Sequence, residues 1–261
     1  MPAPDDAADR ALLERAARAA GEIAGRFFKR DPRVWDKGDQ GPVTEADLAI
    51  DAMLRETLTA ARPDYGWLSE ESMPEGRTPG TRVFVIDPID GTRAFIEGNP
   101  DFTHSLAVVE AGAPVAAAIH QPERDRTWTA HRGGGASLDG APLTPSPRAE
   151  LDGARVLTAK PTLRPELWRA PPGFERAFRS SLAYRLALVA EGRFDAMLTL
   201  RDCWEWDIAA GALICAEAGA TVTDRAGRPL RFDGPDALLP GTVAAPPVLH
   251  AALLDRLAPP G

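Results

Sequence analysis

One stretch decides the fold of this chain: Asp87-Pro88-Ile89-Asp90-Gly91-Thr92. It follows Arg82-Val83-Phe84-Val85-Ile86, a run of mostly β-branched and apolar residues that predicts a buried strand. Because proline has no N–H and disfavours helical backbone before it, we expect the strand to end at Asp87. The Gly91-Thr92 turn is then expected to lead into a helix that begins near Arg93.

The same stretch carries two carboxylates, Asp87 and Asp90, near the end of that strand. Like charges this close repel each other unless a cation lies between them. Mg²⁺ favours carboxylate oxygens, and the backbone N–H groups of a turn such as Gly91-Thr92 bind anions. The stretch therefore indicates a metal site beside a phosphate site, although Asp-Pro and Asp-Gly are also ordinary turn dipeptides.

Composition narrows the classes of protein. The chain has 261 residues, 44% of them hydrophobic, which is enough for a sizeable core. The net charge of -8 argues against binding to a nucleic acid polymer or an anionic membrane, but a metal can still attract a small anionic substrate. Cys203 and Cys215 lack metal-ligand and disulfide spacing, so we expect buried thiols in a cytoplasmic protein. Met1 to Arg10 is acidic, so no signal peptide is expected, nor is any transmembrane segment.

Two helices and a strand are predicted before the central stretch. Apolar residues recur at helical spacing from Asp5 to Phe28. Thr44-Glu45-Ala46-Asp47 resembles a capping box, so a second helix is expected to begin there. Tyr65 to Ser69 is expected to form a short strand, and Glu70-Glu71 follows directly. A solvated helix face and a solvated strand end are the alternative interpretations of Asp47 and of the Glu pair.

Three strand-like runs after the central stretch predict an antiparallel meander: His104 to Glu110, Pro114 to His120 and Thr127 to Ala130. The Pro- and Ser-rich segment from Thr144 to Leu151 then predicts a boundary between a subdomain of residues 1–150 and one of residues 151–261.

Strands and helices alternate in the second half. A helix is expected from about Ser181 to Glu191, and another begins at Trp206-Asp207, with Asp207 as its N-cap. This alternation predicts a mixed α/β protein built in layers.

Four acidic signals occur in an order that resembles the inositol monophosphatase superfamily of metal-dependent phosphatases. The family pattern is an Asp on an early helix, then Glu-Glu, then Asp-Pro-Ile/Leu-Asp-Gly-Thr/Ser, and then Trp-Asp-x-x-Ala-Gly. In this chain the pattern is met at Asp47, Glu70-Glu71, 87–92 and 206–211. The resemblance implies the layered α/β/α/β/α sandwich of the sugar phosphatases, with the metal site between an α+β half and an α/β half.

The resemblance also implies which residues hold metal. Glu70, Asp87 and the main-chain carbonyl of Ile89 would hold one Mg²⁺. Asp87, Asp90 and Asp207 would hold a second, and a third, weaker ion is often found near Glu70 in such enzymes. Asp90 and Asp207 are expected to contact the substrate as well. Sensitivity to lithium and a homodimer are further expectations from the family.

The resemblance also implies the mechanism: a water activated by the metal attacks the phosphate, and no covalent intermediate forms. Thr92 and Glu70 would orient and deprotonate that water, and Asp47 would hold the Thr92 hydroxyl. The N–H groups of Gly91 and Thr92 would bind the phosphate. Lys37 matches a basic position near the phosphate, although a lone lysine is usually just solvated.

Within the superfamily, three stretches look most like the bacterial 3'(2'),5'-bisphosphate nucleotidases: 91–96, 181–192 and 205–211. In that branch the second stretch often carries a basic residue near the place of Arg185, which could bind a second phosphate. Tyr184 or a tryptophan could stack on adenine. The predicted reaction is hydrolysis of adenosine 3',5'-bisphosphate to AMP and phosphate.

Several alternatives stay open. Arg185 could be a surface residue on an amphipathic helix, and Trp204 and Trp206 could be core residues. The acidic chain shows no obvious basic cluster for a doubly phosphorylated nucleotide. Inositol 1-phosphate, histidinol phosphate and sugar phosphates are therefore alternative substrates, and a non-catalytic binder of phosphorylated ligands is a less favoured class.

Overall fold

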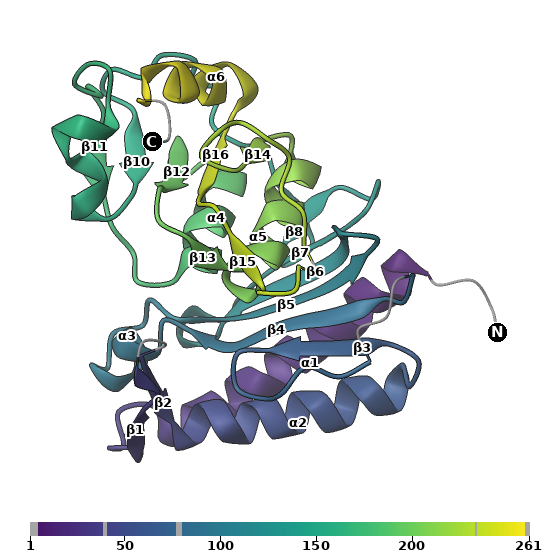
Figure 1. Cartoon of the computed structure of the whole chain (residues 1–261). Helices are drawn as coiled ribbons and strands as arrows, with labels where there is room; N and C mark the ends of the chain where they lie inside the picture. The colour runs from purple at the N-terminus through teal and green to yellow at the C-terminus, as the bar shows by residue number, and fades with distance from the viewer. Residues whose placement is uncertain (1–4, 39–40, 77–79, 233, 259–261) are drawn as a thin grey trace.

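The fold is an α/β/α/β/α sandwich, as predicted (Figure 1). The computed structural model describes residues 5–38, 41–76, 80–232 and 234–258. Helices α1 (Asp6–Phe27) and α2 (Glu45–Ala61) cover one face of a large sheet. Helices α4 (Leu182–Ala190) and α5 (Glu205–Ala218) cover its other face and separate it from a smaller sheet. Helix α6 (Pro247–Arg256) covers the outer face of the smaller sheet.

The large sheet has seven strands in sequence order, and the predicted meander forms its centre. Its first two strands pair in parallel and all the others are antiparallel. The strands are β3 (Gly66–Ser69), β4 (Val83–Asp90), β5 (Thr103–Glu110), β6 (Ala113–Gln121), β7 (Arg126–His131), β8 (Ala136–Leu138) and β9 (Ala141–Pro142).

The prediction that the central strand ends at Asp87 is wrong. β4 pairs with β5 up to Asp87, and pairing resumes at Asp90 opposite Thr103 after a register shift. Such a bulge accommodates Pro88, because a bulged residue need not donate a ladder hydrogen bond. It also has a consequence for the carboxylates. Residues three apart in a regular strand point to opposite faces, whereas the bulge lets Asp87 and Asp90 reach the same place.

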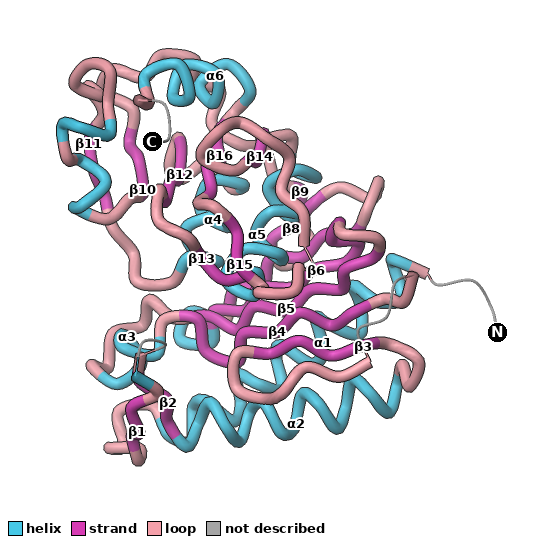
Figure 2. Tube along the Cα trace, viewed as in Figure 1, coloured by secondary structure: helices cyan, strands magenta, loops and turns pink. Residues whose placement is uncertain are grey.

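The smaller sheet has five strands in the order β11-β10-β12-β16-β14. Its strands are β10 (Arg155–Leu157), β11 (Glu175–Ala177), β12 (Ala196–Thr199), β14 (Thr221–Thr223) and β16 (Thr242–Ala245). Two short antiparallel pairs complete the strands described: β1 (Val34–Asp36) with β2 (Pro42–Thr44), and β13 (Cys203–Trp204) with β15 (Leu238–Leu239). The remaining α-helix of the described residues, α3 (Thr92–Ile96), follows β4 directly (Figure 2), and three short 3₁₀ helices lie at Pro122–Arg124, Lys160–Leu163 and Pro165–Leu167.

Alternation along the strands explains the layers. In β4, Val83 and Val85 pack in the same core cluster as α4 and α5, whereas Phe84 and Ile86 pack with α1 and α2. This is the period of two expected for a strand buried on both faces. The first cluster also contains Met197 of β12, so a single core joins the two sheets through α4 and α5.

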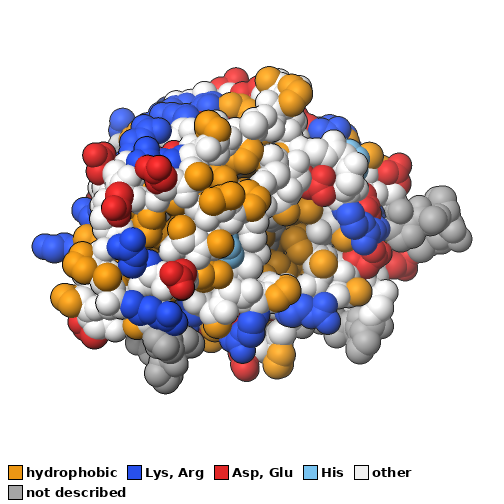
Figure 3. Space-filling view, turned by 90° about the horizontal axis from the view of Figure 1, so that it is seen from above, with side chains coloured by type: hydrophobic (Ala, Val, Ile, Leu, Met, Phe, Trp, Pro, Cys, Tyr) orange, Lys and Arg blue, Asp and Glu red, His pale blue; other side chains and the backbone are white. Residues whose placement is uncertain are grey.

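The segment from Thr144 to Leu151 connects the two sheets without forming a helix or strand. A division into two subdomains at this segment stays a prediction. Both cysteines are buried, as expected. None of the helices described here is long and apolar enough to cross a membrane. The first four residues of the segment considered as a signal peptide lie outside the described residues. On the face above the smaller sheet, basic and acidic side chains are mixed with hydrophobic ones (Figure 3).

Candidate active site

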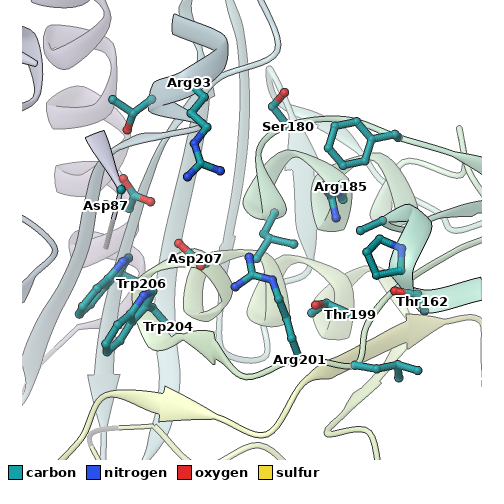
Figure 4. Close-up of a pocket in the computed structure, with 18 of the residues that line it drawn as sticks. Asp87, Arg93, Thr162, Ser180, Arg185, Thr199, Arg201, Trp204, Trp206 and Asp207 are labelled. Carbon is teal, nitrogen blue, oxygen red and sulfur yellow. The ribbon is translucent and has the colours of Figure 1, made fainter. Parts of the chain in front are cut away.

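A pocket of about 700 Å³ lies where the β4–α3 turn meets α4 and the start of α5. Asp87 and Asp207 lie side by side on one wall, and Arg185, Thr162 and Thr199 lie on the opposite one (Figure 4). The pocket therefore brings together residues from both halves of the chain, as the resemblance implied.

Three aspartates form a cluster at this pocket: each of Asp87, Asp90 and Asp207 offers a carboxylate oxygen within 4.8 Å of the others. Oδ1 of Asp87 is buried and has no hydrogen-bond partner among the described residues. Burial raises the pKa of Asp87 and of Asp207 well above the ordinary value, and repulsion from neighbouring carboxylates, Glu70 among them, adds to the effect.

This cluster fits a divalent cation. An unpartnered buried oxygen and several mutually repelling carboxylates are costly by themselves, and oxygen-rich sites of this kind are what Mg²⁺ favours. Three of the four predicted acidic ligands therefore come together.

Asp90 is held by the start of α4. Its Oδ2 accepts hydrogen bonds from the Ser181 hydroxyl at 2.7 Å and from the Ala183 N–H at 2.6 Å. Burial raises the pKa of Asp90 to about 6, although these bonds lower it. Ser181 is itself the N-cap of α4. The carboxylate is thereby fixed in position by a helix from the other half of the chain.

Asp207 is not an N-cap, contrary to the prediction. Helix α5 begins at Glu205, and the N-cap position belongs to Trp204, whose side chain makes no capping bond. Asp207 lies in the first turn of the helix, where a negative charge is favoured by the helix dipole.

Thr92 and Asp47 interact as predicted. The Thr92 hydroxyl lies 3.3 Å from Oδ1 of Asp47 and 3.1 Å from the carbonyl oxygen of Ile89. The capping box is also confirmed: Oδ2 of Asp47 accepts from the N–H of Thr44 at 2.8 Å and from its hydroxyl at 2.5 Å. Burial raises the pKa of Asp47 to about 6. Asp47 is therefore no solvated residue of a helix face.

Glu70 lines the pocket but lies outside the cluster of three aspartates. The Lys37 ammonium is 3.0 Å from Glu70 and 2.7 Å from Glu71. Burial alone would lower the pKa of Lys37, but the two carboxylates outweigh burial and raise it. The Glu71 side chain is only 2% exposed, and burial raises its pKa to about 7 despite the lysine. Lys37 therefore joins the two glutamates rather than standing alone in solvent.

The β4–α3 turn, which is predicted to bind phosphate, lines the pocket, and phosphate binding there stays a prediction. Ile89, Gly91 and Thr92 all line the pocket. Gly91 has a φ of 102°, and a Cβ atom there would lie 3.2 Å from the carbonyl oxygen of Asp101. Glycine is thus required both by the left-handed backbone and by the close approach of the neighbouring chain.

Arg185 lines the pocket and is only 5% exposed, so the alternative of a surface arginine is wrong. Tyr184 does not face the pocket: it is buried against Trp128, with ring centroids 5.8 Å apart. The expectation that Tyr184 stacks on a base is therefore wrong. Helix α4 turns these two neighbours in different directions, because successive residues are about 100° apart around a helix.

Sequence reasoning named Arg185 but missed the other three arginines of the pocket. Four arginines line it: Arg93, Arg164, Arg185 and Arg201. They are scattered along the chain, so no charge run marked them. Trp204 and Trp206 also line the pocket and stack on each other, with ring centroids 4.9 Å apart and planes 9° apart. They are wall residues of the site and not only core.

Comparison with known proteins shows the family of this chain. It matches the inositol monophosphatase family over residues 6–259 and belongs to that family. It is 37% identical to an inositol-1-monophosphatase of Rhizobium meliloti over 229 residues, 83% of this chain and 85% of that protein. It is 36% identical to a histidinol-phosphatase of Mycobacterium tuberculosis, covering 94% of this chain and 95% of that one.

A solved structure has a similar fold. The crystal structure of the extragenic suppressor protein suhB from Bartonella henselae matches with a TM-score of 0.83 and 30% identity, covering 95% of this chain and 97% of that one. The predicted superfamily and the predicted class of enzyme, a phosphatase, are confirmed.

Proposed function

We propose that the protein is a Mg²⁺-dependent phosphomonoesterase whose metal ions are held by Asp87, Asp90 and Asp207. The observation that supports this most is the aspartate cluster with the unpartnered Oδ1 of Asp87. Glu70 and the carbonyl of Ile89 would complete the ligand set, with two ions and a weaker third near Glu70. When bound, the ions supply Lewis-acid stabilisation of the attacking and leaving oxygens of the phosphate ester.

The chain's own residues would position the attacking water. The single proton of the Thr92 hydroxyl is shared between Asp47 and Ile89, so the oxygen lone pairs remain to accept a hydrogen bond from that water. Glu70 is the proposed general base, and Lys37 keeps it oriented through their ion pair. The N–H groups of Gly91 and Thr92 would hold the phosphate oxygens.

For the substrate, we favour a 3'(2'),5'-bisphosphate nucleotide, with hydrolysis of adenosine 3',5'-bisphosphate to AMP and phosphate. Two observations support it. Arg185 presents a buried guanidinium to the pocket, and the stacked pair of Trp204 and Trp206 offers a flat aromatic wall for a base. The four pocket arginines also remove the objection that the chain lacks a basic cluster.

Inositol 1-phosphate is the second candidate substrate. It is favoured by the relative from Rhizobium meliloti, which is named an inositol-1-monophosphatase and shares most of its length with this chain. The inositol ring carries no charge and would leave the pocket arginines without a partner. We rank inositol 1-phosphate second for that reason.

The test is phosphate release by the purified protein with Mg²⁺, measured as kcat/KM for adenosine 3',5'-bisphosphate and for inositol 1-phosphate. We expect the nucleotide to be preferred, EDTA to abolish turnover reversibly, and lithium to inhibit it. Turnover that persists in EDTA would contradict the metal mechanism. A preference for inositol 1-phosphate would leave that mechanism in place and make the second candidate the substrate.

A further inference from the structure

His104 lies behind the aspartate cluster, opposite the bulge of β4. Asp87 pairs with Ser105 and Asp90 pairs with Thr103, so His104 alone faces the two residues between the aspartates. The side chain is fully buried, and His104 is not among the described residues that line the pocket. It therefore contacts β4 from inside the protein and not from the side where a substrate would bind.

Side chains along β5 alternate between the two faces of the large sheet. Phe102, just before the strand, and Leu106 pack in the same core cluster as α1 and α2. On the other face, the Ser105 hydroxyl donates to the Trp206 carbonyl of α5 at 2.9 Å. His104 lies on the same face as Phe102 and Leu106, because side chains two apart in a strand point the same way. This is the face away from the aspartate cluster.

The imidazole holds the middle of the bulge. Nδ1 of His104 lies 2.5 Å from the Pro88 carbonyl oxygen. A carbonyl oxygen can only accept, so Nδ1 carries the hydrogen and Nε2 keeps a lone pair. That Nε2 is buried and has no partner among the described residues, which is costly. An apolar side chain would avoid this cost, so the contact with Pro88 is what the histidine adds to the sheet.

His120 of β6 keeps the imidazole of His104 in place. The two rings are stacked, with centroids 6.1 Å apart and planes 23° apart. Nδ1 of His120 lies 2.9 Å from the Thr127 hydroxyl. A Cβ atom at Gly21 of α1 would lie only 2.7 Å from Nε2 of His120, so the backbone of α1 lies directly against this ring. His104 is therefore packed from behind and stays directed at Pro88.

We propose that His104 is a positioning residue of the metal site. It holds the Pro88 carbonyl on one face of the sheet, so that Asp87 and Asp90 direct their carboxylates to the other face and to the aspartate cluster. It also fixes the peptide group that precedes the Ile89 carbonyl, a proposed metal ligand. His104 acts through β4 and touches neither metal nor substrate. The inference rests on the proposed function, because it takes the cluster to bind Mg²⁺.

Two substitutions separate this contact from simple packing. His104→Leu keeps an apolar side chain in the core but removes the donor. His104→Asn loses part of the ring, but its amide nitrogen takes the place of Nδ1 and can donate to the Pro88 carbonyl. His250→Leu is the matched control: His250 of α6 is also buried, and it is hydrogen-bonded to the Thr223 hydroxyl, away from the pocket.

The first measurement is the affinity for Mg²⁺, by calorimetry without substrate. We expect His104→Leu to bind Mg²⁺ at least about tenfold more weakly than the wild type, the usual loss when a residue that orients metal ligands is removed. His104→Asn and His250→Leu should bind within about threefold of the wild type. Wild-type affinity in His104→Leu, or an equal loss in His104→Leu and His104→Asn, would overturn the proposal.

The second measurement is urea unfolding of each protein with Mg²⁺ and with EDTA. Mg²⁺ stabilises a protein by an amount set by its affinity for the folded state, so each variant serves as its own reference even where a buried substitution weakens the fold. The stabilisation by Mg²⁺ should be smaller in His104→Leu than in the other three proteins. If His104→Leu shows no unfolding transition, His104→Met takes its place with the same expectation. Equal stabilisation in all the proteins would overturn the proposal.

The kinetic signature is a difference between metal and substrate. In His104→Leu, half-maximal phosphate release should require about tenfold more Mg²⁺, whereas the substrate KM at saturating Mg²⁺ should change by less than about twofold. An unchanged Mg²⁺ requirement would overturn the role of His104 and leave the phosphatase intact. If the wild type binds Mg²⁺ through His104-dependent geometry but hydrolyses no phosphate ester, the proposed function fails and the role of His104 stands. A wild type that binds no Mg²⁺ would contradict both.

Discussion

At the scale of single residues, the site depends on carboxylates that are unfavourable by themselves. Burial raises the pKa of Asp47 and of Asp90 to about 6, and raises those of Asp87 and Asp207 further. A group with a raised pKa binds its proton more tightly in the folded state than in the unfolded one. Without metal, these groups therefore stabilise the fold at low pH and lose that contribution as the pH rises through their folded pKa values.

We predict that Asp87→Asn is more stable than the wild type in EDTA, and increasingly so as the pH rises from 5 to 7. Removal of one charge relieves the repulsion within the cluster, and at pH 7 the gain should be roughly 1–3 kcal/mol. The measurement is urea unfolding of both proteins at several pH values. In Mg²⁺ the order should reverse, because the variant has lost a ligand. A variant that is less stable than the wild type in EDTA at pH 7 would contradict this.

The sequence was enough to predict the chemistry of these carboxylates, but it did not predict which residues surround them. Asp87 and Asp90 lie three residues apart in one motif and Asp207 lies in another, so the sequence alone shows these carboxylates. Arg164, Arg185 and Arg201 lie on separate elements, and only the packing of α4 against α5 and the smaller sheet brings them to one pocket. Nothing in a linear charge pattern marks such a cluster.

At the scale of elements, the bulge in β4 is the feature that sequence reasoning misread. Pro88 predicts that the strand ends at Asp87, but β4 pairs with β5 again at Asp90, beyond the proline. His104 of β5 accounts for part of this: its Nδ1 lies 2.5 Å from the Pro88 carbonyl oxygen, which has no place in a regular ladder. Burial lowers the pKa of His104 to about 3, so the ring is neutral and donates one hydrogen. The sequence shows a histidine within an apolar run, but its contact with the bulge can be recognised only once the strand pairing is known.

Helix packing explains a motif residue that has no chemical role. Gly211 lies on α5, and a Cβ atom there would lie 2.5 Å from Cβ of Leu186 on α4. We predict that Gly211→Ala lowers the free energy of unfolding by about 1–3 kcal/mol, because the two helices must separate. It should also weaken catalysis, since α4 carries Arg185 and α5 carries Asp207.

Gly25→Ala is the control for that variant, measured by the same urea unfolding. Gly25 also lies inside a helix, α1, but nothing lies within 4 Å of an added Cβ. Alanine is favoured over glycine in a helix by about 0.5–1 kcal/mol, so Gly25→Ala should be stabilising. Similar effects from the two substitutions would show that helix propensity, and not the contact with Leu186, decides the result.

At the scale of the whole molecule, the two sheets share one core. The cluster that contains Val83 of the large sheet also contains Met197 of the smaller sheet, joined by α4 and α5. We therefore predict a single unfolding transition, with the same midpoint by tryptophan fluorescence and by far-UV circular dichroism. Two separated transitions would instead support two subdomains that unfold independently on either side of Thr144 to Leu151.

The alternation of helices and strands was enough to predict the layered class, and the order of the acidic motifs was enough to predict the family. The sequence did not show that α4 supplies Ser181 and the Ala183 N–H to Asp90. These contacts join residues far apart in the chain, and they depend on how the two halves pack. The site lies at that junction, so its geometry follows from the whole fold.

The central claim is that the aspartate cluster is the metal site of a phosphatase, and Asp90→Asn tests it most directly. The measurement is phosphate release with Mg²⁺ by the wild type and the variant, with folding checked by circular dichroism. Asparagine can still accept from Ser181 and Ala183 through its amide oxygen, so the fold should survive while the negative charge is lost. We predict a loss of activity of at least about a hundredfold in a folded protein. A folded variant with wild-type phosphate release would contradict the assignment of this site.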